Sequence, residues 1–158
     1  MGEERPERDE ARVLFEAEHL RLTEDPALRA LWFTRLPTRP DDPAELLQDY
    51  RLAVGYTGPL HRGYTAIIDA REAPGRQDAA YEPIGLRIRG ELARRYARVV
   101  VLLQSVAGVL HARRFQSRDQ LPIEIVRSVE EAMAIAAGAR ERPSDRAPAE
   151  GSFGDDER

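Results

Sequence analysis

Apolar residues recur along the chain with two different periods, and a period of two or an unbroken apolar run predicts a β-strand. The first such stretch alternates from Arg12 to Leu22, and a turn is expected at Thr23–Pro26 because proline fixes φ and Asp25 can bond its own backbone. The run 98–104 is continuously apolar, which is typical of a parallel strand buried on both faces. The pattern therefore predicts strands over 12–22, 30–36, 64–69, 98–104 and 121–126.

Elsewhere the apolar residues recur every three to four positions, which predicts amphipathic helices over 43–54, 79–96, 106–117 and 129–137. Asp42 is placed to cap the first helix, with Pro43 at its first position and Glu45 placed to close a capping box. Ser105 can cap the third helix, or its position can receive an anion at the helix N-terminus, and Ser128 forms a capping box with Glu131 before the fourth.

The second helix is the least regular of the four. Asp78 is placed to cap it, because its side-chain oxygen can accept from the N–H groups of the first turn. Pro83 is tolerated only near a first turn, so the helix either begins nearer Tyr81 or bends at the proline. Gly85 and Gly90 indicate close packing against the sheet.

The order of these elements predicts an α/β fold, a single-domain sandwich with about four helices on a mixed sheet, composed of an N-terminal β-hairpin plus parallel strands. The domain is expected to span residues 11–138. The segments 1–10 and 139–158 are polar and charged, and both are expected to be disordered. The prediction requires Ile67 and Ile68 to lie in the sheet, parallel to Val100–Leu103.

Composition narrows the functional classes. The chain has 42% hydrophobic residues, a net charge of −4 and no cysteine, and its 24 basic residues are all arginine. The absence of Lys and Cys excludes Schiff-base lysine chemistry, a Walker-type phosphate loop and thiolate catalysis. The central region is nearly neutral and the ends are acidic, so we expect no nucleic-acid partner.

The same reading predicts a cytoplasmic protein. No apolar run approaches the length of a membrane span, and the first ten residues do not resemble a signal peptide. His19, His61 and His111 lack metal-ligand spacing, and no serine lies in a Gly-x-Ser-x-Gly elbow. We therefore expect no catalytic residue, no metal and no cofactor. Asp69 and Glu72 are a carboxylate pair with no other catalytic group to support it.

The best candidate site is the loop that follows strand 64–69, because ligands and partners of open α/β sheets favour the carboxyl ends of the strands. The alternative is that Asp69 and Arg71 pair locally and that Pro74–Gly75 is only a turn. The candidate partner-binding residues are Asp69, Arg71, Glu72, Gly75, Arg76, Gln77, Asp78 and Tyr81.

Three segments, YTAIIDAREAPGRQDAAYE, RVVVLLQS and LPIEIVRSVEEAMAIA, resemble the STAS superfamily, the anti-sigma-factor antagonist fold, and its bacterial SpoIIAA-like relatives. The likeness covers roughly residues 12–137. The resemblance implies a regulatory domain that binds another protein. Antagonists of that family carry a phosphorylatable Ser or Thr at the start of the helix after the Asp-ending strand. Here no Ser or Thr lies between Thr65 and Ser105, so the family's phosphate switch is not expected.

Two functions remain open at this point. The first is a non-catalytic bacterial regulatory or scaffolding module that binds an unidentified protein through the 69–82 loop and the second helix, with homodimer formation left open. The second is a small-molecule or lipid carrier of SpoIIAA-like or CRAL-TRIO-like type. Its apolar cavity would be lined by the bulky aromatic residues Trp32, Phe33, Tyr50, Tyr56 and Tyr81.

Overall fold

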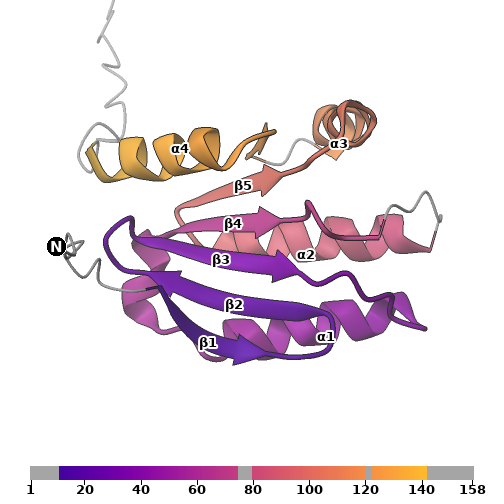
Figure 1. Cartoon of the computed structure of the whole chain (residues 1–158), viewed down its shortest axis with the longest axis horizontal. Helices are drawn as coiled ribbons and strands as arrows, with labels where there is room; N and C mark the ends of the chain where they lie inside the picture. The colour runs from indigo at the N-terminus through magenta and orange to yellow at the C-terminus, as the bar shows by residue number, and fades with distance from the viewer. Residues whose placement is uncertain (1–10, 75–79, 120–121, 142–158) are drawn as a thin grey trace, which may run out of the picture.

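The computed structural model of the chain describes residues 11–74, 80–119 and 122–141. Within these residues the fold is α/β, with a mixed sheet and four α-helices, as predicted (Figure 1). The elements follow in the order β1 (Arg12–Glu16), β2 (Leu20–Asp25), β3 (Ala30–Arg35), α1 (Pro43–Val54), the 3₁₀-helix η1 (Pro59–Gly63), β4 (Thr65–Asp69), α2 (Tyr81–Arg95), β5 (Arg98–Leu102), α3 (Val106–Asp119), β6 (Ile123–Val126) and α4 (Val129–Glu141).

The strands of the sheet lie in chain order, β1-β2-β3-β4-β5-β6. The pairs β1–β2 and β2–β3 are antiparallel, and β3, β4, β5 and β6 are parallel to one another. Ile67 lies opposite Val100 and Ile68 opposite Val101, so the parallel pairing on which the fold prediction rested is confirmed. Figure 1 shows β1 to β5 side by side in this order, with α1 next to α2.

The single strand predicted over 12–22 is wrong, because the chain reverses within it. The backbone N–H of Ala17 bonds to the carbonyl of Leu20 at 2.8 Å, and β1 and β2 form a hairpin. The buried His19 ring is held by Thr38, whose Oγ1 lies 2.7 Å from Nδ1. This turn carries no Gly, Pro or Asn. The apolar positions do shift across it, from the odd-numbered Phe15 and Ala17 to the even-numbered Leu20 and Leu22.

The turn predicted at Thr23–Pro26 lies further along the chain, because β2 extends to Asp25. Asp25 Oδ1 accepts a hydrogen bond from the Leu28 N–H at 3.1 Å. Arg29 then adopts a left-handed conformation with φ 52°. Its guanidinium lies against Gly63, where an added Cβ would come within 2.8 Å of Nη2, which explains a glycine at that position.

The sheet separates two apolar cores. On one face the buried side chains of β2–β5 pack against α1 and α2, through residues such as Phe33, Tyr50 and Leu92. On the other face Ile67, Val100 and neighbouring residues pack against Ala132 and Ala136 of α4. Because successive residues of a strand point to opposite faces, the neighbouring residues Ile67 and Ile68 belong to different cores.

The predicted caps hold for three helices. Asp42 Oδ1 accepts from the Ala44 N–H at 2.9 Å, Ser105 Oγ from the Gly108 N–H at 3.0 Å, and Ser128 Oγ from the Glu131 N–H at 3.1 Å. The Glu45 N–H bonds to the carbonyl of Asp42 at 3.0 Å.

The cap predicted at Asp78 lies outside the described residues. The N-cap position of α2 is Ala80, which has no capping side chain. The helix begins at Tyr81, so Pro83 falls in its first turn, where a proline is tolerated. No helix in the described part of the chain has the length and the apolar character needed to cross a membrane.

Candidate functional site

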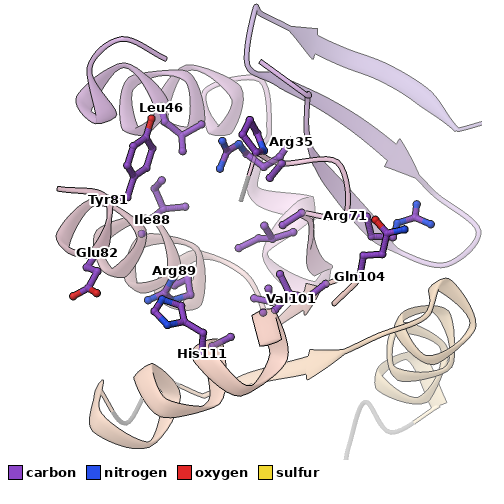
Figure 2. A pocket seen from close by; sticks show the side chains of 18 of the residues that line it. Arg35, Leu46, Arg71, Tyr81, Glu82, Ile88, Arg89, Val101, Gln104 and His111 are labelled. Carbon is purple, nitrogen blue, oxygen red and sulfur yellow. The ribbon is translucent and has the colours of Figure 1, made fainter. Parts of the chain in front are cut away.

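A pocket of about 480 Å³ lies on the α1/α2 face of the sheet, where the carboxyl ends of the parallel strands meet α2 and α3. Figure 2 shows its side chains converging from the strands and from all three helices of this face. Its floor is apolar and consists of Leu46, Tyr50, Ile68, Ile88, Val101, Leu103 and Ile123. Its polar lining consists of Arg35, Arg39, Arg71, Tyr81, Glu82, Arg89, Gln104, Ser105 and His111.

Arg35 is a charged residue on the core-facing side of β3. Leu31 and Phe33 point into the α1/α2 core, and by strand alternation Arg35, the last residue of β3, points the same way. Its Nε atom is closed off from solvent and has no hydrogen-bond partner among the described residues. Arg35 lines the pocket next to its apolar floor (Figure 2).

Tyr50 forms the part of the floor beneath Arg35. Its ring stacks on Phe33, with centroids 5.6 Å apart and planes at 17°. Burial raises the pKa of Tyr50 from 10.0 to about 12, while the positive charges of Arg35 and Arg89 partly oppose this shift. Both guanidinium groups thus act on the same hydroxyl from different elements, β3 and α2.

Arg89 lines the pocket from α2, one helical turn after Gly85. A Cβ added at Gly85 would lie 3.0 Å from Arg89 Nη1, so the guanidinium lies over Gly85 along the pocket side of α2. Gly85 had been interpreted as a sign of close packing on the sheet. It instead makes room for a charged group in the wall of the pocket.

Asp69 and Arg71 form an ion pair, which is the local pairing that the sequence analysis gave as an alternative to a binding site. Arg71 donates from Nε to Oδ1 and from Nη2 to Oδ2, both at 2.9 Å, and its backbone N–H bonds to Oδ1 at 3.2 Å. The Asp69 carboxylate is nearly buried and raises the pKa of Arg71 through these bonds. The pair fixes the first turn of the loop, and Arg71 also lines the pocket.

The other predicted site residues divide into three groups. Tyr81 lines the pocket, and its hydroxyl donates to the carbonyl of Pro40 at 3.2 Å. Glu72 is exposed and does not line the pocket. Gly75, Arg76, Gln77 and Asp78 lie outside the described residues.

The aromatic cavity lining proposed for a carrier is partly found. Tyr50 and Tyr81 line the pocket. Phe33 is fully buried behind Tyr50, and Trp32 packs against the α4 core on the opposite face of the sheet. Tyr56 is 62% exposed and stacks near Phe15, away from the pocket.

Sequence analysis missed the basic residues of the pocket, Arg35, Arg39, Arg89 and His111. For Arg35 a signal was present, because a charged residue occupies an inward position of a strand whose other inward positions are apolar. Arg89 follows Gly85 by one helical turn, so the two residues are neighbours on the surface of α2. The sequence does not show that this side of the helix lines a pocket.

The histidines outside the pocket are engaged in the fold. His61 Nδ1 accepts from the Gly58 N–H at 2.9 Å, and its Nε2 lies 3.3 Å from the buried Glu24 carboxylate. His19 bonds to Thr38, as described above. Among the described residues, no cluster of three or more His, Asp or Glu side chains is arranged to hold a metal ion.

The pocket is not the crevice that open α/β sheets form where their strand order reverses. The parallel strands here follow one another without reversal. The rule that ligands bind where the strand order of an open α/β sheet reverses therefore does not place a site here. The hollow instead lies between α2 and α3, beside the strand ends. The predicted loop and the pocket thus lie at the same edge of the sheet, but the walls of the pocket were not predicted.

Comparison of the chain with protein-family models, with curated proteins and with solved structures gave no match. The resemblance to the STAS superfamily therefore stays a prediction, and the function is argued from the site itself.

Proposed function

We propose that the protein is a binding module that takes a small organic molecule in the pocket between α1, α2 and α3. The observation that supports this proposal is a hollow of about 480 Å³ with a continuous apolar floor beneath polar walls. Small-molecule sites usually have volumes of about 300–1,000 Å³, are mostly apolar and carry a few polar groups that orient the ligand. The pocket has each of these properties.

Asp69, the carboxylate at the end of β4, is engaged in the fold. It does not line the pocket, and its oxygens accept two guanidinium bonds and a backbone N–H bond from Arg71. The proposed role is therefore recognition, in agreement with the carrier alternative drawn from the sequence.

Native mass spectrometry of gently purified protein tests this proposal, together with thermal unfolding in the presence of decanol as an apolar probe. We expect either a retained ligand or a rise in melting temperature on addition of the probe. Ala112→Phe, which places a ring in the pocket wall on α3, should abolish both effects. Ala107→Phe is the matched control, because Ala107 is exposed on the same helix outside the pocket.

The proposal fails if the wild-type protein retains nothing and responds to neither decanol nor charged apolar compounds. It also fails if Ala112→Phe and Ala107→Phe behave alike in both measurements.

Binding of a protein partner through the 69–82 loop and α2 is the second candidate, as the STAS resemblance implies. It is favoured by the position of Arg71, Ala73 and Pro74, which line the pocket from the start of this loop, so a ligand and a partner would act on the same segment. Capture of partners from native lysate, compared with the variant in which Arg76 and Asp78 are changed to Ala, tests this function. If the variant captures the same partners as the wild type, the loop does not take part in partner binding.

A further inference from the structure

We propose that the ligand of this pocket is an organic anion whose charged group binds the guanidinium of Arg35 and whose apolar body lies on the floor formed by Ile88 and Val101. The inference rests on the proposed binding function and adds to it the chemical class of the ligand and the residue that selects it.

The position of Arg35 is the first argument. The residue is only partly buried and lines the hollow next to its apolar floor. Its Nε is closed off from solvent, so an acceptor in the pocket would bind the terminal N–H groups of the guanidinium. A guanidinium presents adjacent N–H groups in a planar fork, which matches the two oxygens of a carboxylate or of a phosphate group.

The charges of the lining are the second argument. Among the described lining residues there are four arginines, Arg35, Arg39, Arg71 and Arg89, against one carboxylate, Glu82. Asp69 neutralises Arg71. Arginines thus outnumber carboxylates in the described lining, next to an apolar surface where charge interactions are screened less than in bulk water.

The positions of Arg35 and Arg89 are the third argument. They come from β3 and α2, and both line the pocket beside the same apolar floor. The Arg89 guanidinium lies over Gly85, where an added Cβ would come 3.0 Å from Nη1. The chain thus places two positive groups beside one apolar surface.

The shape of the pocket gives the orientation of the ligand. Figure 2 shows Arg35 at one end of the hollow and His111 of α3 at the other, with Ile88 and Val101 between them. An anionic group at Arg35 would leave the apolar body to extend along these side chains toward α3. A molecule with a charged end and a flexible or aromatic body fits this arrangement, whereas a compact polar anion would leave the floor uncovered.

The test compares three probes with the same ten-carbon chain, decanoate, decyl phosphate and decanol, by isothermal titration calorimetry at pH 8 and low salt. We expect the anions to bind wild-type protein about 10- to 100-fold more tightly than decanol, the range expected for a charge-assisted bond to a desolvated partner. The two anions distinguish a carboxylate from a phosphate as the natural head group. Acetate and inorganic phosphate, which lack the apolar body, should bind weakly.

Arg35→Met isolates the proposed contact, because it keeps an unbranched apolar stem and removes the charge. In this variant decanoate should bind about as tightly as decanol, and the affinity for decanol should stay that of the wild type. Arg87→Met is the matched control, since Arg87 is exposed on α2 outside the pocket, and it should keep the preference of the wild type. Gly85→Ala is a second variant, expected to displace Arg89 and to reduce the preference in part.

The outcomes separate the two proposals. If decanol binds as tightly as decanoate to wild-type protein, or if Arg35→Met keeps the preference, the inference is overturned and the binding function stands. If no ten-carbon probe binds and native mass spectrometry finds no retained ligand, both fail.

Discussion

At the scale of single residues, Tyr50 combines a structural contact with a position in the proposed site. Its ring stacks on Phe33 in the core, and only 3% of the residue is exposed. Its hydroxyl lies in the field of Arg35 and Arg89. A tyrosine that ionises there would place a negative charge inside the core, so the protein should resist its ionisation.

This resistance predicts a loss of stability at high pH. Below pH 10 the Tyr50 hydroxyl is protonated in both the folded and the unfolded chain, so its contribution is fully present. As the pH rises toward the folded pKa of about 12, only the unfolded chain loses the proton, and the free energy of unfolding should decrease by about 2–3 kcal/mol. Urea unfolding between pH 9 and 12 measures this loss, and Tyr50→Phe should remove that part of it. An unchanged pH profile in Tyr50→Phe would contradict the prediction.

The candidate residues named from the sequence were those with visible local chemistry. Asp69 and Arg71 could be found because they follow a buried strand directly, and their pairing is a contact between neighbours in the chain. Arg35 and Arg89 lie 54 residues apart, and they meet only because β3 and α2 flank the same floor. A pocket formed by tertiary packing leaves no spacing motif in the sequence, so its basic wall could not be predicted from patterns alone.

At the scale of elements, the caps decide where the helices begin. Asp42 holds the first turn of α1 through its bond to the Ala44 N–H, and Leu46 of the same turn region lines the pocket. Asp41, its neighbour, is also exposed but forms no such bond. The two adjacent carboxylates therefore offer a matched pair for measuring the cap.

We expect Asp42→Ala to lower the free energy of unfolding by about 1 kcal/mol, because it leaves an N–H group of the first turn without its partner. Asp41→Ala should change it by less than about 0.5 kcal/mol, as is usual for surface substitutions. Chemical unfolding followed by circular dichroism measures both. Equal effects of the two substitutions would show that charge near the helix end, and not the hydrogen bond, stabilises α1.

Small residues let α4 lie close to the sheet. Ala132 is fully buried against the β4–β5 face, whereas Ala134 is exposed on the same helix. We expect Ala132→Leu to destabilise the protein by about 1–3 kcal/mol, because the added carbons have no space without moving the helix. Ala134→Leu should leave the thermal unfolding midpoint nearly unchanged. A tolerated Ala132→Leu would mean that α4 can shift without loss of packing.

The elements themselves were largely predictable, and the errors have a common cause. The parallel strands and all four helices were found, because each carries a hydrophobic period and most carry a turn or cap signal. The β1–β2 reversal was missed, and its turn is stabilised by His19 and Thr38, which are 19 residues apart in the chain. The local sign was the shift of the apolar positions between Ala17 and Leu20, which the prediction of one strand overlooked.

At the scale of the whole molecule, one face of the sheet packs on α4, and the other packs on α1 and α2 and carries the pocket of the proposed function. Val100 faces the α4 core, and its neighbour Val101 lines the pocket. Both are buried, so each should contribute a similar amount to stability while only one lies near a ligand.

Val100→Ala and Val101→Ala should each lower the free energy of unfolding by about 1–3 kcal/mol, the cost of removing buried methyl groups. Only Val101→Ala should alter the affinity for decanoate in calorimetry. A change of affinity in Val100→Ala of the same size would show that the two faces of the sheet are coupled.

The strand order has a consequence for biosynthesis. Every strand of the described sheet pairs with the strand made just before it, so a chain leaving the ribosome never has to hold an unpaired strand open for a partner translated much later. Each new βα segment can dock on a surface that already exists. We expect arrested nascent chains that end after β5 to be already protected from protease at β2 and β3, and cleavage there would show that the sheet forms only on release.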